Sequence, residues 1–275
     1  MSISAADVKA LRDRTGSGMM DCRSALAEAN GDMEAAVEVL RKKGQKVSEK
    51  RADREANQGI VVTMISDDNK SAIIMSLNCE TDFVARNEEF IGFANGFASV
   101  AFEAKTDSIE TINGLSYKGL TIAKHLEDLV GKIGEKIEIA RVAYLEGTGE
   151  IIAYNHPGNL LGVLVQFDGD LNSADTGRDV AMQIAAMNPI GVKRADVPAE
   201  TLEKELEIAK EMLINEGKSP ELAEKAAQGK LRRFYEDRVL LEQKFVKDNS
   251  VTIDQYLKKS GAPTVITFKR VQLGA

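Results

Sequence analysis

The spacing of apolar residues separates helical from strand-like segments along the chain. In the N-terminal part, three runs with helical spacing are interrupted at Gly16, Asn30-Gly31 and Gly44. Glycine and asparagine are common at helix ends, where the backbone often turns left-handed. We therefore predict three short helices that end at these positions, with Asp32 as the N-cap of the third. Their few apolar side chains predict a small core of low intrinsic stability.

Two later segments each have a strand–turn–strand pattern followed by a helical pattern. In the first, residues 59–66 and 71–77 flank a polar turn, and in the second, residues 150–155 and 161–167 do so. Polar turn residues between two apolar runs are typical of β-hairpins. The repeated plan predicts two related α+β subdomains. Further elements are predicted as helices at about 87–101, 120–130 and 176–187 and strands at 136–145 and 264–271.

A helical hairpin is predicted before the last strand. Leu202, Leu206, Ala209 and Leu213 follow one another at spacings of 4, 3 and 4 residues, as in a short coiled-coil seam. Gly217 ends this helix, and Ser219-Pro220 is a typical start for the next. Apolar residues expected to continue the seam are Leu222, Ala226 and Leu231.

Thr81-Asp82-Phe83-Val84 lies where the apolar run 71–78 passes into a helical pattern that begins at Phe90. Connections at strand ends often carry function. One interpretation is structural: Phe83 folds into the core, and Asp82 stabilises the helix start through the helix dipole. The other is that the aromatic ring and the carboxylate are presented to a partner. The residues alone leave both interpretations open.

Composition restricts the class of protein. The chain has 275 residues, enough for two or three small domains, with 43% apolar residues and a net charge of −7. An acidic surplus argues against a protein that coats nucleic acid, so we expect no nucleic-acid partner. Residues 41–58 are locally basic; we interpret residues 45–58 as a solvated linker, with RNA contact as the alternative.

The two cysteines, Cys22 and Cys79, are too few for a disulfide framework, which favours a reducing compartment. The N-terminus has no basic stretch followed by an apolar one, and no run of 18 apolar residues occurs. We therefore expect neither a signal peptide nor a membrane span. The expected location is cytoplasmic.

Enzyme chemistry finds little support. The best hypothesis is a thiol hydrolase built from Cys79, His156 and a carboxylate, Glu80 or Asp82. The only other histidine is His125, and no glycine-rich nucleophile turn accompanies Cys79. A Cys at a strand end is usually a small buried hydrophobe. We expect no enzyme, no catalytic residues, no metal site, no cofactor and no direct nucleotide binding, because a P-loop is missing.

Four separated motifs resemble those of the bacterial elongation factor Ts family. They are Leu11-Arg-Asp-Arg-Thr-Gly-Ser-Gly-Met-Met-Asp-Cys22, the segment around Thr81-Asp-Phe-Val84, Gly131-Lys-Ile-Gly-Glu-Lys-Ile137 and Leu161-Gly-Val-Leu-Val165. The resemblance extends in order over nearly the whole chain. The expected α+β fold comprises a ubiquitin-associated-like three-helix domain (1–44), a basic linker (45–58), a core N-subdomain (59–146), a core C-subdomain (147–197 and 235–275) and a protruding coiled-coil hairpin (198–234).

The resemblance implies guanine-nucleotide exchange on the GTPase elongation factor Tu during translation. It further implies where the partner binds. The expected contact residues are Arg12, Met19 and Met20 in the first domain, Thr81, Asp82, Phe83 and Val84 at the strand–helix junction, His156 in the second subdomain, and Phe245 and Val246 near the chain end. For the two methionines, packing in the small helical core is the alternative.

A second function stays open at this point. A ubiquitin-associated-like adaptor for nascent chains or the ribosome would use residues 1–44 and the basic linker, but would leave residues 59–275 without a role. A homodimer formed through the predicted hairpin is also possible on the pattern of its apolar face.

Overall fold

The structure, a computed structural model, describes residues 3–274 and has an α+β fold. The helices are α1 Ala5–Thr15, α2 Met19–Glu28, α3 Met33–Arg51, α4 Asp82–Ala85, α5 Glu88–Glu103, α6 Ile109–Gly114, α7 Ile122–Ile133, α8 Ala174–Met187, α9 Ala199–Asn215, α10 Pro220–Arg238 and α11 Ile253–Lys259. The strands are β1 Gln58–Ile65, β2 Ser71–Cys79, β3 Ser116–Tyr117, β4 Leu120–Thr121, β5 Glu138–Glu146, β6 Ile151–Asn155, β7 Leu161–Phe167, β8 Lys244–Phe245, β9 Asp248–Thr252 and β10 Val265–Gln272.

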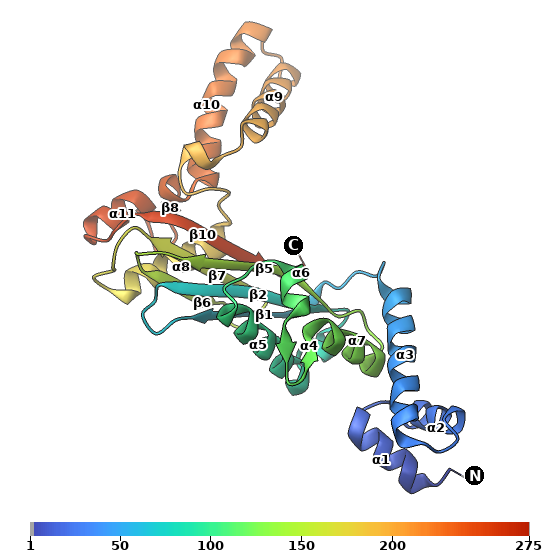
Figure 1. Cartoon of the computed structure of the whole chain (residues 1–275). Helices are drawn as coiled ribbons and strands as arrows, with labels where there is room; N and C mark the ends of the chain where they lie inside the picture. Colours follow the sequence, from blue (N-terminus) through green and yellow to red (C-terminus); the bar gives the residue numbers. More distant parts are fainter. Residues whose placement is uncertain (1–2, 275) are drawn as a thin grey trace.

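Two three-stranded antiparallel sheets form the centre of the molecule. Their strand orders are β1-β2-β5 and β10-β7-β6. In Figure 1 these sheets lie in the middle, α1–α3 lie at one end, and α9 and α10 project from the other. The antiparallel hairpins β1–β2 and β6–β7 are those predicted from the sequence.

The two sheets pack against each other through one face each, and helices cover the two outer faces. Side chains alternate along a strand, so Val61 faces the space between the sheets while Ile60 and Val62 face the helices. The residues between the sheets are Val61, Ala72, Ile74, Leu145, Ile151, Leu164 and Val271. Burial on both faces explains why β2 and β7 are almost continuously apolar.

The outer core of the first sheet contains Phe90, Ala94 and Phe97 of α5 and Leu129 of α7. The outer core of the second sheet contains Val180 and Ile184 of α8 and Leu257 of α11. Each sheet therefore has its own helical layer, and the order across the centre is helix, sheet, sheet, helix.

The turns of the two hairpins join the sheets by a reciprocal pair of hydrogen bonds. Val61 N–H donates to Asn159 O at 2.7 Å, and Ile151 N–H donates to Asn69 O at 2.8 Å. Both asparagines have positive φ, 57° for Asn69 and 55° for Asn159, a conformation that asparagine tolerates better than most residues. The turn residues thus fix the relative position of the sheets as well as the hairpins.

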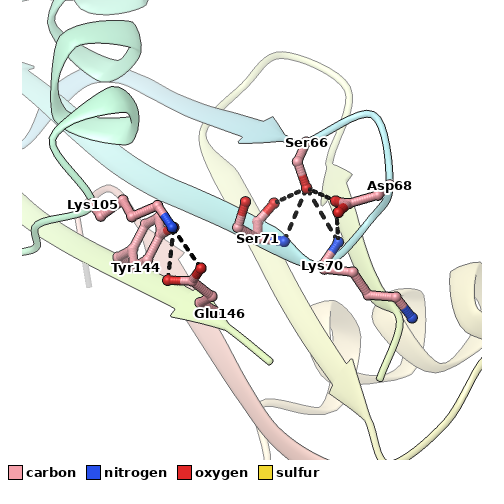
Figure 2. Close-up of polar contacts among 7 residues, drawn as sticks. All are labelled: Ser66, Asp68, Lys70, Ser71, Lys105, Tyr144 and Glu146. Atoms are coloured by element: carbon pink, nitrogen blue, oxygen red, sulfur yellow. Dashed lines mark hydrogen bonds and ion pairs between the residues drawn. The ribbon is translucent and has the colours of Figure 1, made fainter. Parts of the chain in front are cut away.

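Figure 2 shows the polar contacts that hold the first of these turns. The Ser66 hydroxyl donates to Asp68 Oδ1 at 2.6 Å and accepts the backbone N–H of Ser71 at 3.0 Å. The Ser66 hydroxyl also lowers the pKa of the Asp68 carboxyl. Nearby, Lys105 after α5 pairs with Glu146 at the end of β5 at 2.6 Å.

Helices α1–α3 enclose a small core of their own. Its buried members are Val8, Leu11, Cys22, Ala25, Leu26 and Ala36. The prediction that the third helix ends at Gly44 is wrong, because α3 continues to Arg51. Gly44 is buried within α3 and lies against Gly131 of α7, where an added Cβ would be 2.6 Å from Gly44 Cα. Here glycine permits close helix contact rather than ending a helix.

Helices α9 and α10 pack along each other through Ala209 and Leu213 on one side and Ala223 and Ala227 on the other. Leu206 of the predicted seam lies against this cluster. The prediction for Leu222 is wrong, since this side chain is 57% exposed. The small alanine side chains let the two helices approach closely. On α10 the contact is made by Ala223 and Ala227, so it begins one residue after Leu222.

Among the described residues, none of the helices has the length and apolar character needed to cross a membrane.

Candidate functional site

Phe83 is the most exposed large apolar residue of the described chain. It lies in α4, a single turn between β2 and α5, and its exposed fraction is 84%. The next two residues, Val84 and Ala85, pack against the core of the first sheet. The structural interpretation of Phe83 as a core residue is therefore wrong: the ring points outward from a short helix that is anchored on its other side.

Thr81 anchors the start of this turn through one carboxylate. Its hydroxyl donates to Glu135 Oε1 at 2.7 Å, and its backbone N–H donates to Glu135 Oε2 at 3.0 Å. Glu135 is brought there by Gly134, which ends α7 in the left-handed conformation with φ of 79°. The Thr81 side chain is thus engaged within the chain, whereas Phe83 is free on its surface.

Glu80 ties the same junction to α3. Its carboxylate accepts from Arg51 at 2.7 Å, from Arg54 at 3.1 Å and from the backbone N–H of Lys136 at 2.6 Å. Burial alone raises the pKa of Glu80, but the N–H of Lys136 and the two guanidinium groups outweigh it and lower the pKa to about 2. The carboxylate stays ionised, and the region interpreted as a solvated linker contributes two arginines to a structural contact.

Asp82 lies beside Phe83 on the surface. Its carboxylate forms an ion pair with Arg86 at 3.0 Å, one helical turn further on, and its side chain is 48% exposed. An exposed pair of this kind contributes little to stability. Both groups therefore stay available for contacts outside the chain.

The predicted N-terminal contact residues also lie on the surface. Met20 is 70% exposed and Met19 is 44% exposed, both in the first turn of α2. Arg12 is exposed in the last turn of α1. The alternative that the methionines fill the small helical core is wrong for the pair as a whole, because neither belongs to that core.

The remaining predicted residues have mixed positions. His156 is exposed in the turn after β6, and its Nδ1 is 3.0 Å from the Tyr154 hydroxyl. Phe245 is buried in the second core, where its ring stacks on Tyr256 at 4.3 Å between centroids. Val246 next to it is 47% exposed. Of these two neighbours, Val246 is the one that faces outward, and Phe245 holds it in place.

Cys79 has none of the features of a nucleophile. The thiol is fully buried, and its Sγ donates to Thr81 O at 3.2 Å. Burial is the main cause that raises the pKa of Cys79 to about 12, with Glu135 adding to the effect. A thiol in this state does not form the thiolate that attack requires. Within residues 3–274, no group of three or more His, Cys, Asp or Glu side chains is arranged to hold a metal ion.

Comparison with known proteins identifies the family. The family model described as "Elongation factor TS" matches residues 80–275. Elongation factor Ts of Prosthecochloris aestuarii is 46% identical over 285 aligned residues, which cover 99% of each chain. The proteins of that name from Christiangramia forsetii and Chlorobaculum tepidum are each 45% identical, again with 99% of both chains covered.

The chain belongs to the elongation factor Ts family.

The structure gives physical reasons for the elongation factor Ts motifs of the sequence. In Gly131–Ile137, Gly131 permits the α3 contact, Gly134 ends α7, and Glu135 binds Thr81. In Leu161–Val165, an added Cβ at Gly162 would lie 2.8 Å from Val61 Cγ1 of the opposite sheet. These two motifs therefore each contain a glycine at a point of close approach.

Sequence reasoning missed the residues that support the exposed ring of this elongation factor Ts family member. Glu80 and Glu135 were not singled out as anchors, and Arg51 was assigned to a solvated stretch. The signal available for Glu135 was its place in a motif directly after Gly134. For the Arg51–Glu80 pair the sequence holds no signal, because 29 positions separate the two residues.

Proposed function

We propose that this protein is a guanine-nucleotide exchange factor that binds elongation factor Tu in its GDP form and promotes GDP release during translation elongation. Family membership supports the proposal, and the exposed, anchored Phe83 is the observation in this chain that carries it. The exchange reaction involves no covalent step of the chain itself. It calls for binding energy that favours the nucleotide-free partner, and by linkage such a factor weakens GDP binding by the same factor.

Phe83 is suited to act as a wedge. GDP is held in GTPases by Mg²⁺ and by backbone amides around the phosphates. A ring inserted beside these elements shifts them and lowers the barrier to GDP release. Burying an exposed aromatic side chain in a partner contributes roughly 2 kcal/mol. Asp82, next to the ring and half exposed, provides a carboxylate for partner hydrogen bonds or for the water shell of the metal.

The other contacts of the proposal extend over the same protein. Arg12, Met19 and Met20 dock on the GTPase through α1 and α2, since methionine adapts well to such surfaces. Thr81, bound to Glu135, and Val84, packed on the core, hold the turn that presents the Phe83 ring to the partner. His156 and Val246, with Phe245 behind it, form a second contact on the other half of the molecule.

The proposal also includes the finer architecture. Residues 1–44 are a ubiquitin-associated-like domain, the two sheet–helix halves are related subdomains, and α9 with α10 is an inserted coiled-coil hairpin. The reciprocal bonds of Asn69 and Asn159 support the relation between the halves, because the asparagine of each turn accepts a backbone N–H from a strand of the opposite sheet. The adaptor alternative is not favoured, since the likeness to elongation factor Ts proteins extends over 99% of the chain.

The test is release of fluorescent GDP from elongation factor Tu in the presence of this protein and of two variants. Phe83→Ala removes the proposed wedge, whereas Leu222→Ala removes an apolar side chain that is also exposed, at 57%, but lies on α10. We expect Phe83→Ala to lose about 30-fold in release rate, which corresponds to roughly 2 kcal/mol, and Leu222→Ala to behave as wild type. Equal rates for wild type and Phe83→Ala would refute the wedge.

A further inference from the structure

The junction that carries Phe83 and the loop after α7 hold each other through two adjacent residues on each side. Glu135 accepts the backbone N–H of Thr81 at 3.0 Å, and Glu80 accepts the backbone N–H of Lys136 at 2.6 Å. Each segment thus offers a carboxylate to the N–H of the residue after the other carboxylate. We refer to Glu80-Thr81 and Glu135-Lys136 together as the reciprocal clamp.

The clamp consists of hydrogen bonds to charged carboxylates. Hydrogen bonds to charged groups are roughly twice as strong as bonds between neutral groups. The Glu135 carboxylate uses both oxygens on one residue, because the Thr81 hydroxyl adds a bond of 2.7 Å. Asp82, the residue after Thr81, begins α4, a helix of only 4 residues. So short a helix has little stability of its own, and its orientation depends on what holds its start.

We infer that Glu135 is a positioning residue for nucleotide exchange: its two hydrogen bonds to Thr81 fix the direction in which α4 presents Phe83. This inference rests on the proposed function. Without the bonds, the backbone at Thr81 rotates more freely, and the ring spends less time in the direction that fits the partner. A ligand group that is preorganised loses less entropy on binding, so Glu135 acts on the exchange rate through Phe83 and not by contact with the GTPase.

Two substitutions weaken the clamp without removing bulk. Glu135→Gln keeps the size of the side chain but leaves one acceptor oxygen and no charge. Thr81→Val keeps the shape of the side chain and loses only the hydroxyl bond, while Thr81→Ser retains that bond and serves as the conservative rescue. We expect Glu135→Gln to lower the maximal rate of GDP release about tenfold, Thr81→Val less, and Thr81→Ser hardly at all.

A second readout does not depend on exchange. The chain contains no tryptophan, so Phe83→Trp introduces a single indole at the tip of α4. Its fluorescence anisotropy reports how freely this position moves. We expect Glu135→Gln, added to Phe83→Trp, to lower the anisotropy, while the thermal unfolding midpoint measured on the same sample shows that the protein is still folded. Unchanged anisotropy would overturn the inference, because the clamp would then not restrain the ring.

The deciding experiment combines Glu135→Gln with Phe83→Ala and measures fluorescent GDP release from elongation factor Tu. If Glu135 acts through the ring, Glu135→Gln causes no further loss once Phe83 is alanine. If the two losses multiply, or if Glu135→Gln alone exchanges at the wild-type rate, the inference fails while the proposed function stands. If wild type does not speed GDP release, the proposed function fails. If Phe83→Ala alone exchanges at the wild-type rate, the wedge role of Phe83 fails, and with it the role of Glu135 in exchange.

Discussion

The two sheet–helix halves of the molecule differ in how a strand is connected to the helix that covers its sheet. After β2, the chain forms the extra turn α4 and leaves Phe83 84% exposed before α5 begins. After β7, residues 168–173 lead directly into α8, and Leu171 packs against the core of that half. The second half demonstrates that a strand can pass into its covering helix without an additional turn. In the first half the chain forms a turn whose Val84 and Ala85 pack against the core, while Phe83 of the same turn is left on the surface.

The anchoring of the two connections differs in the same sense. In the second half, Leu171 N–H donates to Glu150 at 2.8 Å, and Asp170 pairs with Lys70 while its side chain is 77% exposed. In the first half, the Glu80 side chain is only 16% exposed and binds two arginines. The connection that exposes an aromatic ring is thus the one with the stronger ionic anchor.

The largest effect on stability is expected from the anchor of the first connection. Glu80→Ala leaves Arg51 and the Lys136 N–H without their partner in a partly enclosed place, which we expect to cost about 3 kcal/mol. Asp170→Ala, the matched change in the second half, breaks an exposed pair and should cost less than about 1 kcal/mol. Urea unfolding of both variants at neutral pH measures the difference. Equal losses would remove the contrast between the two anchors.

Acid should act on the same anchor. The pKa of Glu80 in the folded protein is about 2, compared with an ordinary value of 4.5. A lowered pKa means that the ionised form stabilises the fold above about pH 4.5, and this contribution is lost as the pH falls from there towards 2. We expect the stability of wild type to fall more steeply over this window than that of Glu80→Gln. Parallel curves from urea unfolding at several pH values would contradict the assignment.

A smaller effect is expected where α3 joins the first half. Gly131→Ala places a methyl group 2.6 Å from Gly44 Cα, so α3 must move away from α7, at a cost of about 2 kcal/mol. Gly229→Ala in α10 is the control, because nothing lies within 4 Å of its added Cβ and alanine favours helix. Amide hydrogen exchange should become faster in α1–α3 of Gly131→Ala alone. Unchanged protection there would mean that the glycine contact does not hold the N-terminal helices.

Local patterns predicted the long helices and the strands of the two sheets well, but they missed the short elements α6, α11, β8 and β9 and the contacts between distant segments. Apolar runs and the polar turns between them predicted β1, β2, β6 and β7 within a residue or two, because these signals lie within each hairpin. The end of α3 was misjudged since Gly44 is a typical helix stop, and only its neighbour Gly131, far along the chain, explains why the helix continues. The resemblance pointed to Phe83, whereas its exposure and its support by Glu135 depend on how the first sheet meets α7.

A comparison of Phe83→Ala with Leu171→Ala shows whether Phe83 serves a partner and not the fold. Both variants are measured twice, by fluorescent GDP release from elongation factor Tu and by thermal unfolding. We expect elongation factor Tu to release GDP about 30-fold more slowly with Phe83→Ala than with wild type, and the unfolding midpoint of Phe83→Ala to be unchanged. We expect Leu171→Ala, which removes part of a core side chain, to lose about 2 kcal/mol of stability. At temperatures where it is folded, this variant should promote GDP release at the wild-type rate. A destabilised Phe83→Ala protein that still promotes GDP release at the wild-type rate would show that Phe83 serves the fold and not the partner.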